Sequence, residues 1–147
     1  MNSLIKLLFA ILFFASFGSC SKEDNLSKSA DDIITQASKT VVTGTWIVSN
    51  YNEKGTNQTG NFANYKFTFL SNNTVKATNG TNTINGTWKT GTDDSNAKFN
   101  LSFSAANGPF EEISEDWRIV EITASKIDLH HISGGNGGTS LITFIKI

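Results

Sequence analysis

The chain contains 147 residues, with 12 lysines and arginines against 13 aspartates and glutamates, and its formal net charge is −1. A chain this close to neutrality lacks the basic surface that nucleic acid requires, so we expect no nucleic-acid partner. The single cysteine excludes an intramolecular disulfide. The fold must therefore be stabilised by its hydrophobic core.

Residues 1–19 have the pattern of a signal peptide, with Lys6 before an apolar run at residues 7–17. This run is about half of the roughly 20 residues that a membrane-spanning helix needs. The segment from Phe17 to Cys20 (FGSC) resembles the lipobox of bacterial lipoproteins, with phenylalanine where leucine is commoner. The resemblance implies cleavage before Cys20 and lipid attachment to its thiol. The alternative is an ordinary secretory signal with an incidental cysteine.

Residues 21–25 (SKEDN) resemble the acidic, lysine-containing export tag of surface lipoproteins of the Bacteroidetes type. This resemblance implies an outer-membrane lipid anchor that places the protein at the cell surface. The alternative is a solvated linker whose charges have no specific role.

Residues 20–42 are predicted to be the lipidated cysteine and a polar tether. Within this segment, residues 30–37 predict a short helix, because Ile33, Ile34 and Ala37 recur at helical spacing after a candidate aspartate cap. We expect this helix to rest on the folded domain.

Residues 43–147 form short alternating segments of apolar and polar residues, separated by clusters of asparagine, glycine, aspartate and serine. This pattern predicts eight β-strands. The apolar positions of the eight strands, in chain order, are Trp46 and Val48; Tyr65, Phe67 and Phe69; Val75 and Ala77; Ile84, Gly86 and Trp88; Phe99, Leu101 and Phe103; Trp117 and Ile119; Ile127 and Leu129; and Leu141, Thr143 and Ile145.

Tight polar links at residues 70–74 and 78–81 predict antiparallel neighbours, and Pro109 lies outside every predicted strand. One helical turn is expected near residues 111–116. Because a flat sheet would leave an aromatic face in water, we predict an all-β fold, a small eight-stranded antiparallel up-and-down barrel.

The tripeptide Gly-Thr-Trp opens the first strand at Gly44 and recurs in the fourth at Gly86. With the aromatic strand at 65–70, Asp116-Trp117 and the apolar strand at 141–145, these motifs resemble the lipocalin-like (calycin-like) domains of Bacteroidetes-type lipoproteins. The resemblance covers residues 43–147 and implies a barrel that can hold one small ligand. The chain lacks the disulfide and final helix of secreted eukaryotic lipocalins.

Aromatic side chains supply the candidate ligand site, since small-molecule pockets are lined mainly by such residues. The alternative is that these rings pack against one another as the core that a small domain needs. The residues are Trp46, Tyr65, Phe67, Phe69, Phe99, Phe103 and Trp117.

Other candidate chemistry is weak. His130 and His131 are adjacent, so on a strand they point to opposite faces and cannot easily chelate one metal together. The acidic residues within 111–116 lie in one segment without a catalytic partner, and the glycine-rich stretch at 134–138 lacks the lysine of a phosphate-binding loop. We therefore expect no cofactor, no metal and no enzymatic activity.

The function we expect is a lipid-anchored, monomeric cell-envelope binding protein, with a small hydrophobic ligand held in the barrel. The alternative is a filled-core module that docks onto an envelope protein or a polysaccharide. An exposed Trp88 would favour docking, because aromatic side chains are enriched among interface anchors.

Overall fold

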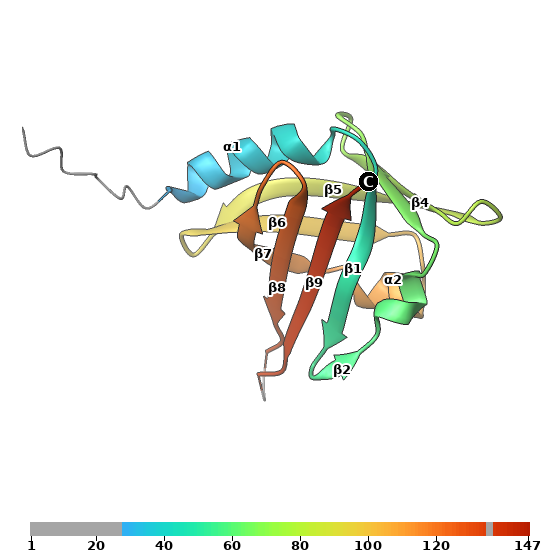
Figure 1. Ribbon diagram of the computed structural model, residues 1–147. Helices are drawn as coiled ribbons and strands as arrows, with labels where there is room; N and C mark the ends of the chain where they lie inside the picture. The colour runs from blue at the N-terminus through green and yellow to red at the C-terminus, as the bar shows by residue number, and fades with distance from the viewer. Residues whose placement is uncertain (1–27, 135–136) are drawn as a thin grey trace, which may run out of the picture.

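The computed structural model describes residues 28–134 and 137–147, so the predicted leader, Cys20, residues 21–25 and the centre of the glycine-rich stretch lie outside the described residues. The described chain consists of one longer helix, short helical turns and a single sheet (Figure 1). In chain order the elements are α1 (Ala30–Val41), β1 (Trp46–Glu53), β2 (Thr56–Asn57), the 3-10 helix η1 (Thr59–Phe62), β3 (Lys66–Phe69), β4 (Thr74–Thr78), β5 (Thr83–Asp93), β6 (Asn96–Phe103), α2 (Pro109–Glu112), β7 (Asp116–Ile122), β8 (Lys126–Ile132) and β9 (Thr139–Lys146).

The sheet closes on itself into a barrel. From β3 to β9 each strand pairs with its neighbours in sequence, every pair is antiparallel, and β1 pairs with both β9 and β3. Trp46 is opposite Phe67 on β3 and Lys146 on β9, which joins the two edges. The two-residue strand β2 only extends the end of β1. The predicted eight-stranded antiparallel up-and-down barrel is confirmed.

Helix α1 lies over one end of the barrel (Figure 1). Its cap is Ser29, whose side chain accepts a hydrogen bond from the Asp32 amide, so the predicted aspartate cap was wrong. Serine at this position satisfies an amide that the first turn leaves without a partner. The helix also continues to Val41, beyond the predicted residues 30–37. None of the helices in the described residues has the length and apolarity needed to cross a membrane.

Apolar burial and two polar contacts hold α1 against the barrel. Ala37 and Val41 are fully buried in the core, and the Gln36 side chain donates a hydrogen bond to the carbonyl of Ile122, at the end of β7. The hydroxyls of Ser38 and Thr90 lie 2.7 Å apart. The helix therefore rests on the domain as expected.

The last strand has the opposite register from the prediction. Ser140, Ile142 and Phe144 point inward and are buried, whereas the predicted residues, Leu141, Thr143 and Ile145, point outward. The stretch is apolar on both faces, so alternation alone does not determine the inward set. Pairing determines it, because Ile142 lies opposite the inward-facing side chains of Leu129 on β8 and Tyr51 on β1.

Gly86 marks the closest approach of two strands. A Cβ atom at this position would lie 2.4 Å from the Ser102 carbonyl oxygen and 3.1 Å from the Cα of Phe103. Only glycine fits this spacing without displacing the backbone of β6.

Candidate functional site

The aromatic residues proposed to line a ligand pocket lie in the barrel interior and contact one another. Phe67 packs edge-on against Phe103 at a centroid distance of 6.1 Å, and Phe69 against Phe99 at 5.7 Å. Phe144 contacts both Phe67 and Phe69. This is the packed arrangement that the core alternative describes. The residues of the set that are buried are Trp46, Phe67, Phe69, Phe99, Phe103 and Trp117, whereas Tyr65 is partly buried just before β3.

The three tryptophans use their polar atoms internally. The indole N–H groups of Trp46, Trp88 and Trp117 donate hydrogen bonds to backbone carbonyls at 2.9 to 3.0 Å. All three side chains are buried. A buried indole that already has a partner cannot serve as an interface anchor, so docking through an exposed Trp88 loses its support.

A polar groove of about 660 Å³ crosses the outside of β5 and β6. Its centre is formed by two facing pairs, Thr87 with Ser102 and Lys89 with Asn100. The β3–β4 turn lines one side and the segment that leads into β7 lines the other. The remaining lining residues are Asn72, Asn73, Trp88, Leu101, Ser114, Glu115 and Asp116.

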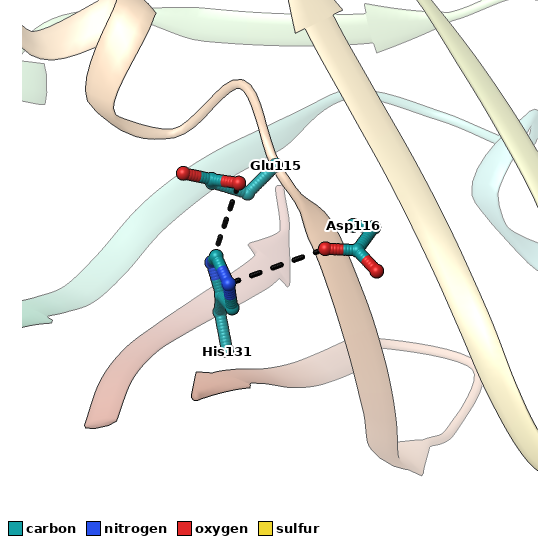
Figure 2. A group of neighbouring side chains, drawn as sticks. All are labelled: Glu115, Asp116 and His131. Carbon is teal, nitrogen blue, oxygen red and sulfur yellow. Dashed lines mark ion pairs between the residues drawn. The ribbon is translucent and has the colours of Figure 1, made fainter. Parts of the chain in front are cut away.

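A histidine and two carboxylates meet at the start of β7. The Nδ1 atom of His131 lies 3.5 Å from a carboxylate oxygen of Glu115, and its Nε2 atom lies 4.0 Å from Oδ1 of Asp116 (Figure 2). The other oxygen of Asp116 accepts a hydrogen bond from the Lys98 ammonium at 3.1 Å. The imidazole also packs edge-on against the Trp117 ring, at 5.8 Å.

These three side chains differ in solvent exposure. The His131 side chain is 18% exposed, whereas those of Glu115 and Asp116 are 43% and 48% exposed. The imidazole is therefore less accessible to solvent than either carboxylate. Asp116 and His131 also line a second outer cleft of about 270 Å³, next to the groove on β5 and β6.

Buried polar atoms lie at the same end of the barrel. Within the described residues, the Tyr51 hydroxyl and one carboxylate oxygen of Glu112 have no hydrogen-bond partner. Burial, followed by the charges of Glu53 and Glu112, raises the pKa of Tyr51, and burial with the charges of Glu53 and Glu111 raises the pKa of Glu112. Negative charge is therefore concentrated here.

Sequence reasoning treated His131 and the acidic residues separately, because fifteen residues and a hairpin separate Asp116 from His131. The antiparallel pairing of β7 with β8 brings His131 and Asp116 together. Arg118 lies opposite His130, so His131, the next residue, lies beside the start of β7. The strands at 117–119 and 127–129 were predicted to be neighbours. The register between them, which the sequence does not give, is what places His131 beside the start of β7.

The fold defines the molecule as a small closed β-barrel whose interior aromatic rings pack against one another and whose outer face carries clefts lined by polar residues. A solved structure of a DUF4847 family protein from Bacteroides vulgatus ATCC 8482 is similar, with a TM-score of 0.51 and 16% sequence identity. The match covers 74% of this chain and 96% of that chain, and it supports the barrel fold. No family model matches the sequence, and neither does any curated protein.

Proposed function

We propose that this protein is a non-enzymatic, lipid-anchored binding module of the cell envelope that binds its ligand on the outside of the barrel. The leader at residues 1–19, Cys20 and the tag-like residues 21–25 support the anchor and the surface location. One observation supports a ligand site on the outer face rather than in the interior: the interior aromatic rings pack against one another.

An interior ligand would have to displace these rings. Protein interiors are packed as tightly as organic crystals, so opening a space for a small hydrophobic molecule would break many contacts at once. An outer ligand requires no such rearrangement. The groove across β5 and β6 is open before the ligand arrives.

The lining of the groove favours a polysaccharide. Thr87, Asn100 and Ser102 present hydroxyl and amide groups, which both donate and accept hydrogen bonds, as sugar hydroxyls do. Lys89 carries one positive charge and Glu115 and Asp116 carry two negative charges, so the groove favours a neutral polysaccharide over a strongly anionic one.

Binding to soluble envelope polysaccharides tests this proposal. The double variant N100A/S102A removes two polar side chains from the centre of the groove. At about 1 kcal/mol for each hydrogen bond, affinity should fall roughly 30-fold. The control is N85A, which changes an exposed asparagine of the neighbouring strand, β5, outside the groove and should bind as the unchanged protein does.

Two further measurements separate the parts of the proposal. The variant C20S should move from the membrane fraction to the soluble fraction, because it removes the thiol that carries the lipid. Native mass spectrometry and displacement of a hydrophobic dye should detect no small molecule in the barrel. A retained hydrophobic ligand, or equal polysaccharide binding by N100A/S102A and the unchanged protein, would overturn binding on the outer face.

A further inference from the structure

The outer cleft of about 270 Å³ next to the groove on β5 and β6 is lined by a row of nitrogen-bearing side chains from three strands. Lys98 on β6 lies opposite Arg118 on β7, and Arg118 lies opposite His130 on β8. Each of the three follows a buried residue on its strand, so their side chains point outward. Side chains that face each other on antiparallel neighbours lie about 5 Å apart at the Cβ atoms. The three groups therefore share one surface.

The two cations of this row differ in how their charge is balanced. Like charges on directly opposite residues of a sheet repel each other and lower stability. The Lys98 ammonium has a counter-charge, because it contacts Oδ2 of Asp116 at 3.1 Å. Arg118 has no carboxylate within ion-pair distance among the described residues. Its guanidinium is therefore the cation of the cleft that still lacks a counter-charge.

The neighbouring carboxylates on this side of the barrel are paired with other cations. Glu121 and Asp128 both contact the Lys126 ammonium, at 2.6 and 2.7 Å. Asp116 is the one acidic residue among the described residues that line the cleft, and Lys98 offsets its charge. The lining thus carries two permanent positive charges and one negative charge. A singly charged anion would balance it.

The other lining residues suit a small, polar organic acid. The guanidinium of Arg118 presents parallel N–H donors that match the two oxygens of a carboxylate. Asn96 and Thr139 add groups that both donate and accept hydrogen bonds, and the exposed Ile132 adds an apolar edge. A sugar acid offers the matching groups, namely one carboxylate, several hydroxyls and an apolar ring face.

We propose that Lys98, Arg118 and His130 form a binding site for the carboxylate of an acidic sugar. Arg118 would pair with the carboxylate, flanked by the Lys98 ammonium and an imidazole N–H of His130, and the sugar hydroxyls would face Asn96 and Thr139. This site lies outside the groove on β5 and β6, and it does not depend on the function proposed for that groove.

Titration with glucuronate, with glucose as the matched neutral sugar, tests the site in the full protein purified in detergent. Nuclear magnetic resonance at low ionic strength follows the backbone amides, and we expect glucuronate but not glucose to shift the signals of residues 98, 118 and 130. R118Q removes the guanidinium, so glucuronate should bind roughly tenfold more weakly. Added salt should also weaken binding. N100A/S102A should bind glucuronate as the unchanged protein does, which separates this site from the groove.

The matched control is K76Q, which also removes one positive charge, from an exposed lysine of β4 outside the cleft, and should bind glucuronate within about twofold of the unchanged protein. Circular dichroism checks the folding of each variant. If R118Q does not fold, K98Q decides, because it leaves Asp116 without its counter-charge and should weaken binding as well. The proposal is overturned if glucose shifts these signals as much as glucuronate does, if the folded variant binds like the unchanged protein, or if K76Q weakens binding equally.

Discussion

The Trp46 indole N–H donates a hydrogen bond to the backbone carbonyl of Val41 at 2.9 Å, and both residues are completely buried. Val41 is the last residue of α1, and Trp46 is the first residue of β1. Carbonyls at the end of a helix have no partner within the helix, so the indole supplies one. This bond joins the helix to the point where the barrel closes, between β1, β3 and β9.

The substitution W46F should therefore destabilise the protein. It leaves the Val41 carbonyl buried without its partner, which costs about 1–3 kcal/mol in the free energy of unfolding, in addition to the lost ring volume. Urea denaturation measures the change. The control is W88F, whose indole bonds to the carbonyl of Leu70, a residue that is 36% exposed and that water can reach. Equal losses in the two variants would contradict the role of the Val41 bond.

Replacing Gly86 with alanine should destabilise the barrel by about 1–3 kcal/mol, because the new methyl group would overlap the Ser102 carbonyl. Gly91 lies on the same strand and has open space around its Cα, so G91A should change stability by less than about 1 kcal/mol. Thermal unfolding of the two variants provides the comparison. If G86A is as stable as G91A, the added methyl group fits beside β6 without the predicted overlap.

The variant Y51F should stabilise the protein by about 1 kcal/mol. It removes a buried hydroxyl that has no partner in the described residues, and it keeps the ring that packs against Phe62 at 5.5 Å. Chemical denaturation measures the difference. A loss of stability would show that the hydroxyl makes a bond that stabilises the fold.

Glu112 should make the protein less stable as the pH rises. Its pKa in the folded state is raised by burial and by nearby carboxylates, so the folded protein binds a proton more tightly than the unfolded chain does. The resulting stability is fully present below the ordinary pKa of 4.5 and is lost as the pH rises through the raised value. We therefore expect E112Q to be more stable than the unchanged protein at neutral pH, with a smaller difference near pH 4.

Asp128 provides a control, because its effect on stability should depend on pH in the opposite direction. Burial alone would raise its pKa, but hydrogen bonds from Lys126 and Thr143 lower it below its ordinary value. Its contribution to stability is present above the ordinary pKa and is lost as the pH falls through the lowered value. D128N should therefore lower stability at neutral pH and have less effect in acid. Denaturation at several pH values measures both effects. If E112Q and D128N change the free energy of unfolding in the same direction at neutral pH, the pKa shifts assigned to Glu112 and Asp128 are contradicted.

Alternation along the chain predicted most of the barrel, because inward residues such as Phe67, Phe99 and Leu129 repeat every second position between polar neighbours. It failed at β9, where both faces are apolar and the register depends on contacts with β8 and β1. It also missed Tyr51, since the irregular pairing between Val48 and Asn50 shifts the inward positions along β1.

The cluster of Glu115, Asp116 and His131 was harder to predict for a related reason. Glu115, Asp116 and His131 were all noticed in the sequence, but their meeting depends on how far β7 and β8 are displaced relative to one another. That displacement includes an irregularity between Ile119 and Glu121. The residue types indicated that titratable side chains were present, whereas the strand register determined which of them meet.

The position of α1 makes the two ends of the barrel different. The Gln36 side chain contacts the carbonyl of Ile122 at one end of β7, whereas Asp116 begins that strand at the other end. The helix therefore lies at one mouth of the barrel, and the opposite end, where β7 begins, is left uncovered by it. A long sugar chain that approaches the start of β7 would not need to displace the helix.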